Sequence, residues 1–467
     1  MTPPVQQHVL ERSTSTLGSL SRTASGSARL RPADVVSLFD AWALLAVLWV
    51  SRMVTGNLDP AVALFGLASF AMILSPKLQR ERLSGGALDD AASIFTRVWF
   101  AYAIASAVTL VAGVGQPRAL LAVAAAAAPA LVLGRAWSHK IERSMRSSGS
   151  KQRTLIVGGG AIARRVIDTL DTHDEYGLEV ISAADDDAMF SAAELGTRFL
   201  GGLSDLPDLV RSHQIEVVIV AFSSGDQSSM IDTIRAAMAG GASVWVVPRF
   251  FELGSAGGEG DHLWGLPVVR LQPPARSKPG WVVKRTLDFV LAALGVVVTA
   301  PLMGIIALAT LIESGRPLLH KQQRVGIDGR PFNILKFRTM VAADEQTIST
   351  EWGENSARIT RVGKILRDTG LDEIPQLFNI LKGEMSLVGP RPERPYFVDL
   401  FSELYPHYDA RHRLPAGVTG WAQIHGLRGD TSIEERAAFD NFYIENWSLS
   451  QDLKILLKTL PTFVRKQ

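Results

Sequence analysis

The chain contains no cysteine among its 467 residues, and this absence excludes disulfide bonds, cysteine-ligated zinc and thiol catalysis. Charged residues are few, at 20%, and the net charge of +2 does not suggest a nucleic-acid partner. The N-terminal stretch lacks a continuous apolar run and is rich in Ser, Thr and Arg, so residues 1–33 are predicted to form a disordered cytoplasmic tail rather than a signal peptide. Hydrophobic residues make up 47% of the chain and mean hydropathy is +0.15, which favours a membrane protein.

Four apolar runs predict a four-helix transmembrane bundle over residues 34–137. They cover residues 35–54, 61–75, 91–114 and 119–133. A bilayer span needs roughly 20 apolar residues, so the first and third runs are long enough. For the second and fourth, which are short, a buried helical hairpin in a soluble domain is the alternative. Asp40 in the first run is costly in lipid, so we expect it to face the bundle interior or to lie near the interface.

Basic residues set the predicted orientation of these runs. They gather before the first run, between the second and third, and after the fourth: Arg22, Arg29, Arg31, Lys77, Arg80, Arg82, Arg135, Lys140, Arg143, Arg146, Lys151 and Arg153. The other two connections carry only Arg52 and Arg118. Because positive residues favour the cytoplasm, we expect the N-terminus and everything after the fourth run to be cytoplasmic.

Residues 138–272 are predicted to form a Rossmann-like α/β domain with a doubly wound parallel sheet. A strand-like run is followed by Gly158, Gly160 and Ala163, which form the G-x-G-x-x-A turn of a dinucleotide fold. Further strands are expected over residues 217–221 and 243–247, with a helix over 228–240 between them. The acidic cluster at 185–187 lies further than the usual ~20 residues from the glycines, so the turn alone is weak evidence for a nucleotide.

Two adjacent carboxylates, Asp372 and Glu373, are the most informative feature of the C-terminal part. Several basic residues precede them in the sequence, and Arg391 follows between two prolines. Such a set can handle a phosphoanhydride, because one carboxylate can attack phosphorus, a second can hold a divalent cation, and arginines neutralise phosphate oxygens. Adjacent carboxylates repel, so both stay ionised only in a compensating field. The alternative is a solvated pair at a helix start.

A family resemblance covers the chain from about Lys284 to the C-terminus. The matching blocks lie, in the family's order, at residues 284–288, 323–326, 336–340, 358–363, 371–376, 389–393 and 417–423. On these blocks the chain resembles the catalytic domain of the bacterial polyprenyl-phosphate glycosyl-1-phosphate transferases, which initiate exopolysaccharide and O-antigen assembly. The membrane-rich N-terminus and the middle α/β region resemble the large members, in which the middle module looks regulatory or assembling. The resemblance implies a mixed α/β catalytic domain over residues 273–467.

The resemblance also implies a reaction and its partners. A sugar-1-phosphate would pass from a nucleoside diphosphate sugar, usually a UDP-hexose, to an undecaprenyl-type polyprenyl phosphate in the bacterial inner membrane. Asp372 would attack the sugar-bearing phosphorus, giving a phosphosugar-aspartyl intermediate, and Glu373 would hold Mg²⁺. The alternative for Glu373 is structural pairing with a nearby arginine. Whether the chain forms a homo-oligomer stays open.

Substrate-binding candidates are basic or amide side chains near these blocks. They are Lys336, Arg338, Arg361, Arg367, Gln376, Arg391 and Arg413. Lys336 and Arg338 alternate with apolar residues, which places them on one side of a strand. Arg361 and Arg367 are equally suited to anionic lipid head groups. Arg411 and Arg413 are expected to supply charge near Pro415, where the chain departs from the family's usual pattern.

Residues 284–312 are predicted to form a re-entrant membrane helix. The segment is long enough to cross the bilayer, but Pro301 near its middle removes a helical hydrogen bond and should break it. A fifth crossing would also put Asp372 and Glu373 outside, away from cytoplasmic nucleotide sugars. A kinked spanning helix is the alternative.

Three further alternatives remain at this point. The stretch 439–460 suits an amphipathic helix, either lying on the membrane or packed in a core. A non-catalytic membrane scaffold that senses a nucleotide is a rival from another functional class. A membrane-anchored NAD-dependent epimerase or dehydratase would need a Tyr-x-x-x-Lys pair, and the middle region has none.

Overall fold

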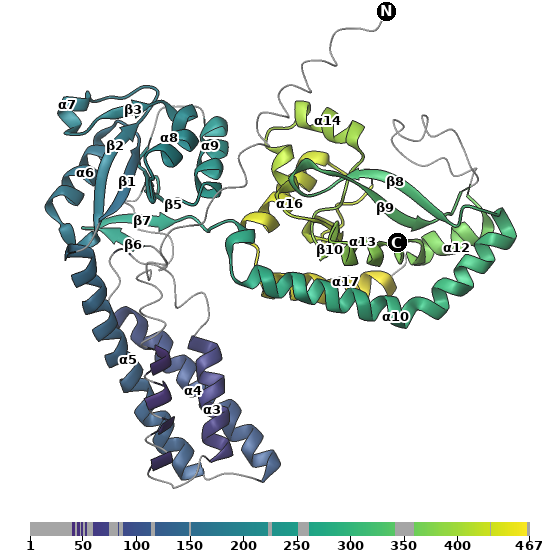
Figure 1. The fold of residues 1–467 in the computed structure, drawn as a ribbon, viewed down its shortest axis with the longest axis horizontal. Helices are drawn as coiled ribbons and strands as arrows, with labels where there is room; N and C mark the ends of the chain where they lie inside the picture. Colours follow the sequence, from purple (N-terminus) through teal and green to yellow (C-terminus); the bar gives the residue numbers. More distant parts are fainter. Residues whose placement is uncertain are drawn as a thin grey trace, which may run out of the picture. The chain divides into compact units, whose positions relative to one another are not determined.

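A computed structural model of the chain describes residues 40–42, 44–46, 48–49, 52–53, 59–73, 83, 87–113, 117–148, 151–222, 227–250, 261–340, 359–429 and 431–464. The predicted tail over residues 1–33 lies outside these ranges. An N-terminal helical bundle, an α/β domain and a C-terminal domain follow one another along the chain (Figure 1).

The bundle contains α3 (Pro60–Ile73), α4 (Ala87–Ala112) and α5 (Pro117–Ser148), and the first apolar run is helical wherever it is described. Its core combines larger apolar side chains with six buried alanines, and small residues let helices approach closely. Within the described ranges, three helices are long and apolar enough to span a membrane: Asp89–Ala112, Arg118–Ile141 and Gly280–Ser314. α3 is apolar but shorter. α5 runs across the predicted domain boundary at residue 137 and continues to Ser148.

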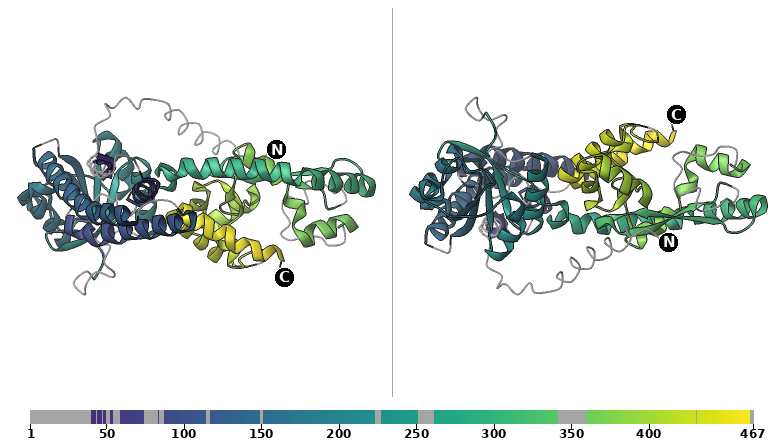
Figure 2. Two further views of the ribbon diagram at one scale, coloured as in Figure 1. Left: turned by 90° about the horizontal axis from the view of Figure 1, so that it is seen from below. Right: turned by 90° about the horizontal axis from the view of Figure 1, so that it is seen from above.

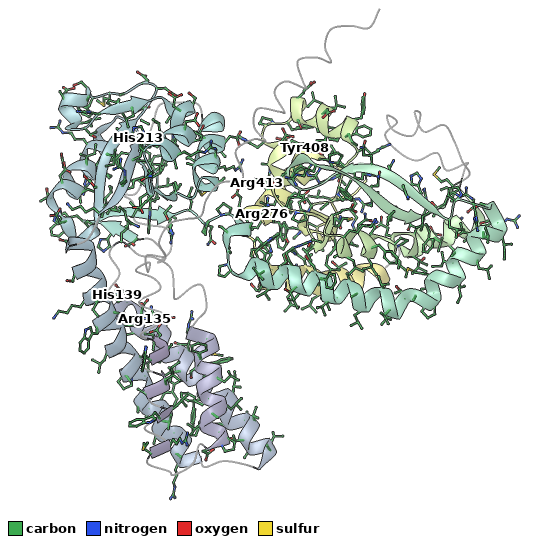
Figure 3. The ribbon with its side chains drawn as sticks, in the orientation of Figure 1. Arg135, His139, His213, Arg276, Tyr408 and Arg413 are labelled. Atoms are coloured by element: carbon green, nitrogen blue, oxygen red, sulfur yellow. The ribbon has the colours of Figure 1, made fainter. Side chains whose placement is uncertain are left out.

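Arg135, which is labelled in Figure 3, is buried in the bundle and pairs with carboxylates from two other segments. The Arg135 side chain is 2% exposed, and its Nη2 lies 2.7 Å from Asp40 Oδ2 while its Nη1 lies 2.8 Å from Asp90 Oδ2. His139 Nε2 is 3.7 Å from the same Asp90 oxygen. The expectation that Asp40 faces the bundle interior is therefore confirmed, and its charge is compensated by a forked guanidinium.

Removal of this arginine should destabilise the bundle. Arg135→Ala leaves two carboxylates buried without their cation, which typically costs about 3–5 kcal/mol. We expect a clear drop in the unfolding temperature of the detergent-purified protein, whereas Arg118→Ala, at an exposed position on the same helix, should leave it nearly unchanged. Equal effects of the two substitutions would contradict a stabilising role for the buried cluster.

The α/β domain is built on one seven-stranded sheet. Its strands are β1 (Gln152–Val157), β2 (Leu178–Ala184), β3 (Phe199–Gly201), β4 (Val217–Val220), β5 (Ser243–Val246), β6 (Asp261–Leu263) and β7 (Leu266–Arg270). The order is β3-β2-β1-β4-β5-β7-β6. The pairs β2–β3, β1–β4 and β4–β5 are parallel, which confirms the predicted strands, whereas β5–β7 and β6–β7 are antiparallel and were not predicted.

Helices cover the sheet of this domain. They are α6 (Ala161–Thr172), α7 (Ala192–Leu195), α8 (Leu206–Ser212) and α9 (Gln227–Ala239), with short 3₁₀ turns η2 (Asp174–Tyr176) and η3 (Leu203–Asp205). Figure 1 shows α6 on one side of the sheet and α8 and α9 on the other. From β1 the chain adds β2 and β3 on one side of the sheet and then returns to add β4 and β5 on the other side. The strand order therefore reverses at β1, as in a doubly wound fold.

The C-terminal domain is mixed α/β, as predicted. Its helices are α10 (Gly280–Ser314), α12 (Arg361–Thr369), α13 (Gln376–Leu381), α14 (Pro395–Leu404), α15 (Trp421–Ile424), α16 (Ile433–Glu445) and α17 (Leu449–Val464). Its strands are β8 (Leu319–Val325), β9 (Pro331–Phe337), β10 (Met385–Val388) and β11 (Ala416–Thr419). Short 3₁₀ turns are η5 (Ala275–Ser277), η6 (Ile327–Gly329), η8 (Leu371–Glu373) and η9 (Tyr408–Arg413). β8 and β9 form an antiparallel hairpin, and β10 and β11 pair in parallel.

The long apolar helix α10 packs on this domain near both of its ends. Near its start, the buried Lys284 donates from Nζ to Asp452 Oδ2 at 2.7 Å, which ties α10 to α17. Near its end, Ile306 packs with Phe337 and Leu366. Beyond that, the Glu313 carboxylate accepts from the first two backbone N–H groups of α12, at 2.8 and 3.0 Å. Figure 2 shows α10 extended along the domain from two further directions.

α10 is one continuous helix across Pro301, where the sequence predicted a break. Proline removes a single backbone hydrogen bond, and the helix continues on either side of that position. Two residues earlier, the Thr299 hydroxyl donates to the Gly295 carbonyl at 2.7 Å, a contact that often accompanies helix bending. Figure 1 shows that α10 bends along its length, so the predicted interruption is a bend.

The C-terminal stretch forms two helices rather than the single amphipathic helix expected over residues 439–460. α16 ends at Glu445, and the Ser448 hydroxyl then accepts from the Gln451 backbone N–H at 3.2 Å, which caps the start of α17. Tyr443, Trp447 and Ile455 are buried in the core, while Leu453 and Leu457 are exposed. The core-packed alternative is met by the buried residues, and contact of the exposed face with a membrane stays a prediction.

Candidate active site

Asp372 and Glu373 lie on a short turn between two helices. α12 is closed by Gly370, whose φ of 70° is the left-handed conformation that favours glycine. The 3₁₀ turn Leu371–Glu373 follows at once, and α13 begins at Gln376. The local sequence thus stops one helix, presents two adjacent carboxylates and starts the next helix within a few residues.

Glu373 receives two cations on the same oxygen. Lys336 Nζ lies 2.7 Å and Arg391 Nη2 lies 3.4 Å from Glu373 Oε1. Burial acts to raise the pKa of Glu373, but the charges of Arg391 and Lys336 and their hydrogen bonds outweigh it and lower the pKa to about 2. Glu373 is therefore an anion at any physiological pH. The pairing with an arginine, weighed from sequence as an alternative, is present.

Asp372 shifts in the opposite direction. Its side chain is 9% exposed, and burial raises its pKa against the positive charge of Lys336, with the neighbouring Glu373 adding to the rise. Arg367 contributes a further charge that acts to lower the pKa of Asp372. Two neighbouring carboxylates with pKa values pushed apart are suited to different chemical roles.

A small cavity lies beside Glu373, and Asp372 is not among its lining residues. Its lining consists of Arg324, Ile334, Lys336, Glu373, Gln376, Arg391, Pro392 and Gly417. Arg324, Ile334 and Lys336 share one face of the β8–β9 hairpin, as their register requires. Three predicted substrate-binding residues, Lys336, Gln376 and Arg391, are thus brought together at Glu373.

Close backbone packing fixes the loop that carries Arg391. A Cβ on Gly417 would lie 2.1 Å from the Gly389 backbone nitrogen, and a Cβ on Gly389 would lie 2.2 Å from the Pro415 carbonyl oxygen. Only glycine fits at these positions without moving backbone. Two of the blocks that carry the family resemblance therefore meet at the site.

Three other predicted residues lie elsewhere. Arg338 donates to backbone carbonyls at the end of α10, including Gly315 at 2.8 Å, so it helps to terminate that helix. Arg361 is exposed at the start of α12. Arg413 Nη2 lies 2.8 Å from Glu445 Oε1, on a different part of the domain. A role for them as substrate contacts stays a prediction.

Two arginines at the site were not singled out from sequence. Arg324 lines the cavity, and burial lowers its pKa to about 10. Burial, and then the charge of Arg391, lower the pKa of Arg428. Arg324 sits in a block of the resemblance, but which way its side chain points depends on strand pairing. That pairing cannot be read from a single sequence.

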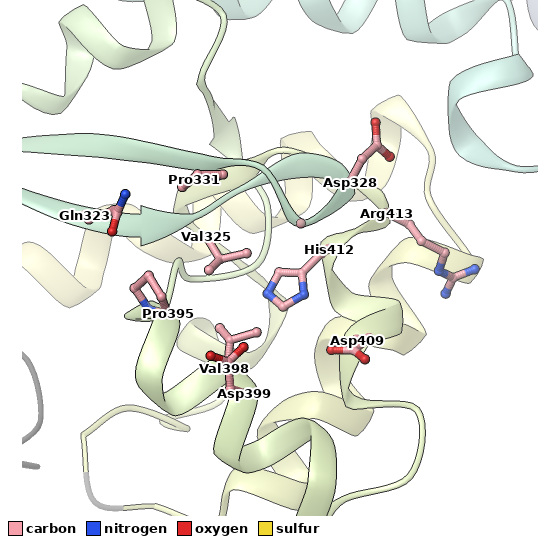
Figure 4. A pocket seen from close by; sticks show the side chains of 11 residues that line it. Gln323, Val325, Asp328, Pro331, Pro395, Val398, Asp399, Asp409, His412 and Arg413 are labelled. Atoms are coloured by element: carbon pink, nitrogen blue, oxygen red, sulfur yellow. The ribbon is translucent and has the colours of Figure 1, made fainter. Parts of the chain in front are cut away.

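A second and larger cavity lies on the other face of β8 (Figure 4). Its volume is about 560 Å³, and its charged lining includes Asp328, Asp399, Asp409 and Arg413. His412 also lines it, and burial, with the charge of Arg411, lowers the pKa of His412 to about 4. Three aspartates repel a phosphate-bearing ligand, so the chemistry points to the smaller cavity at Glu373 instead.

Other groups of the protein occupy the space around the glycine turn of the α/β domain. Gly158 has φ of 119°, and a Cβ there would lie 2.2 Å from the Phe222 carbonyl oxygen. The Gly159 backbone N–H donates to Asp185 Oδ2 at 2.6 Å. Gly160 precedes α6, and Ala163 is fully buried. A phosphate approaching this turn in the usual way would have to displace Asp185.

A magnesium ion held by Asp372 and Glu373 stays a prediction. No cluster of three or more histidine, cysteine or acidic ligands occurs within the described ranges. Mg²⁺, however, is commonly held by one or two carboxylates together with substrate phosphates. Asp372 and Glu373 offer two carboxylates, and one oxygen of Glu373 already pairs with Lys336 and Arg391.

Fold and site together define a class of protein. Long apolar helices accompany an α/β sheet, and a carboxylate pair among cations lies on the domain to which one of those helices is packed. These are the features of a membrane-associated protein that handles phosphate groups.

Comparison with known proteins identifies the family. Residues 280–466 match the family described as bacterial sugar transferase, and residues 86–248 match a family described as a CoA-binding domain. The UDP-glucose:undecaprenyl-phosphate glucose-1-phosphate transferase of Escherichia coli (strain K12) is 32% identical over 328 residues, covering 69% of this chain and 70% of the relative. The chain therefore belongs to the bacterial sugar transferase family.

Other relatives carry the same name. The transferase of Xanthomonas campestris pv. campestris is 30% identical and covers 70% of each chain. That of Caulobacter vibrioides is 46% identical over 185 residues, covering 39% of this chain and 69% of the relative. Among solved structures, UDP-D-quinovosamine 4-dehydrogenase from Vibrio fischeri matches 26% of this chain and 94% of its own at 20% identity, with a TM-score of 0.21.

The lowered pKa of Glu373 predicts a pH-dependent contribution to stability. A carboxyl whose pKa falls from 4.5 unfolded to about 2 folded stabilises the protein above pH 4.5, and this contribution is lost as pH falls toward 2. Glu373→Gln should therefore flatten the fall in unfolding temperature between about pH 5 and pH 3. Glu434→Gln, at an exposed position on α16, should keep the wild-type slope. An unchanged slope in Glu373→Gln would refute the pairing.

Proposed function

We propose that the chain transfers a sugar-1-phosphate from a UDP-hexose to an undecaprenyl-type polyprenyl phosphate, releasing UMP. This would be the initiating step of exopolysaccharide or O-antigen synthesis. The observation that carries this proposal is the buried Asp372 beside Glu373, whose lowered pKa keeps it ionised at neutral pH, with Lys336 and Arg391 converging on Glu373. The relatives' names support the two substrates, because they state undecaprenyl phosphate and UDP-glucose for those proteins.

In the proposed mechanism Asp372 is the nucleophile. Its carboxylate oxygen forms a bond to the sugar-bearing phosphorus as the bond from that phosphorus to the bridging oxygen breaks, and UMP leaves. A lipid phosphate oxygen then attacks the same phosphorus and displaces Asp372. Such in-line transfers depend mainly on positioning and charge neutralisation. Burial of Asp372 weakens its solvation and so favours its reactivity as a nucleophile.

The surrounding residues supply charge neutralisation. Lys336 and Arg391 face the anionic site, where they would bind oxygens of the substrate diphosphate. Glu373, with Asp372, would hold Mg²⁺, which when bound supplies positive charge to the same phosphate oxygens. Arg367 donates from Nε to Thr339 Oγ1 at 2.8 Å, and this contact would keep its charge near Asp372.

Replacement of the nucleophile tests the mechanism. Asp372→Asn keeps the shape of the side chain but cannot attack phosphorus, so we expect UMP release with polyprenyl phosphate to fall by about 10³-fold or more, the scale on which loss of a catalytic nucleophile acts. Asp368→Asn, at an exposed carboxyl on α12, is the matched control and should retain wild-type turnover. Equal turnover by the two variants would show that Asp372 is not the nucleophile.

We also propose that α10 re-enters the membrane rather than crossing it. Residues near both of its ends contact the same domain, through Lys284 with Asp452 and through Glu313 with the start of α12. The outward face between them is apolar and exposed, including Leu294, Val298 and Leu308. A straight crossing would break one set of these contacts or carry the charged domain into lipid.

We propose the rest of the membrane arrangement from the charge pattern of the sequence. We place the chain in the bacterial inner membrane as a multi-pass protein with the four apolar runs of residues 34–137 crossing it. The N-terminal tail, the α/β domain and the active site would then face the cytoplasm. The basic residues between the runs support this orientation.

Single cysteines test the topology cleanly because the chain has none of its own. Arg276→Cys and Lys321→Cys place exposed thiols before and after α10. We expect a membrane-impermeant maleimide to label neither variant in intact cells and both after permeabilisation. Labelling of Lys321→Cys alone in intact cells would mean that α10 crosses the membrane.

A further inference from the structure

Arg411 is a buried cation that the proposed mechanism does not use. From sequence it was expected to supply charge to a substrate near Pro415, but its side chain is 1% exposed and cannot reach a substrate. Its Nη2 lies 2.6 Å from Asp440 Oδ2 and donates to the Arg391 carbonyl at 2.9 Å. Its Nη1 donates to the Tyr408 hydroxyl at 2.7 Å. The buried guanidinium therefore reaches the backbone of the residue that contacts Glu373.

Three successive backbone carbonyls in the loop around Arg391, those of residues 390–392, each accept a hydrogen bond. The Pro390 carbonyl accepts from the Gly417 backbone N–H at 2.8 Å, and the Pro392 carbonyl accepts from Arg324 Nη1 at 3.0 Å. The Arg391 carbonyl between them accepts from Arg411. Prolines on both sides restrict the backbone further. With its main chain fixed in this way, the 40% exposed Arg391 side chain places its Nη2 3.4 Å from Glu373 Oε1.

We infer that Arg411 is a positioning residue that acts through Arg391, an inference that rests on the proposed function. Asp440 compensates the charge of Arg411, so the donor to the Arg391 carbonyl can be kept in the core. A forked guanidinium serves both acceptors at once, which a single-point donor does less well. Loss of this contact would free the Arg391 backbone by a fraction of an ångström, and misplacements of about 1 Å can cost 10²-fold in rate.

The alternative is that the buried pair only stabilises the core. Buried ion pairs can often be replaced by apolar residues of similar volume with little loss of stability. The double variant Arg411→Met/Asp440→Leu therefore separates the two roles, because it removes the donor to Arg391 without leaving a buried charge. Tyr408→Phe removes another partner of Arg411 but keeps that donor, and it serves as the matched control.

The test combines kinetics with hydrogen exchange on the full-length protein in detergent. We expect the double variant to unfold near the wild-type temperature with kcat/KM for UDP-glucose about 10–100-fold lower. In an Arg391→Lys background the same replacement should cost less than about 3-fold, because coupled sites are not additive. Backbone exchange in the peptide containing Arg391 should rise in the double variant and not in Tyr408→Phe.

Each outcome decides the inference. The same fold-loss in both backgrounds, wild-type activity in the double variant, or unchanged exchange at the Arg391 peptide would overturn it. A wild type that releases no UMP would refute the proposed function, and the exchange measurement would still decide whether Arg411 holds the Arg391 backbone. If the double variant does not fold, Arg411→Lys, which keeps a cation beside Asp440, takes its place under the same criteria.

Discussion

The convergence of Lys336 and Arg391 on one oxygen of Glu373 is the constraint on which the rest of the site depends. The three residues come from a hairpin, a proline-flanked loop and a turn between helices. The fold must therefore bring segments that are distant in the sequence together around a single carboxylate. Once closed, the two cations keep Glu373 ionised. The neighbouring Asp372 is left in a buried setting that raises its pKa.

The helix α13 packs both against the hairpin that carries Lys336 and against the apolar helix α10. The buried Asn379 side chain bonds to the backbone of Asn333 and Leu335 on β9, which fixes α13 against the hairpin. Leu377 of the same helix α13 lies against Gly295 of α10. The surface suited to lipid and the carboxylate pair are therefore parts of one packed body, which is what a reaction between a soluble donor and a membrane-bound acceptor requires.

Sequence reasoning succeeded where the deciding interactions are local or carried by a motif. The strands around the glycine turn and the inward Asp40 are confirmed in the structure. Lys336, Gln376 and Arg391, named from sequence as candidate substrate contacts, line one cavity. It failed where long-range pairing decides. Arg338 lies just beyond the end of β9 and turns to the carbonyls that end α10, so its alternation with Lys336 did not place it at the site. The continuity of α10 through Pro301 and the division at Ser448 likewise depend on neighbours that one sequence does not reveal.

The most direct test of the account is the location of the covalent intermediate. The wild-type protein is mixed with UDP-glucose and Mg²⁺ in the absence of polyprenyl phosphate, quenched in acid, digested and analysed by mass spectrometry. The account predicts a hexose-phosphate adduct on the peptide that contains Asp372, and its loss when polyprenyl phosphate is added. An adduct on another residue, or sugar transfer to the lipid with no adduct formed under any quench condition, would contradict it.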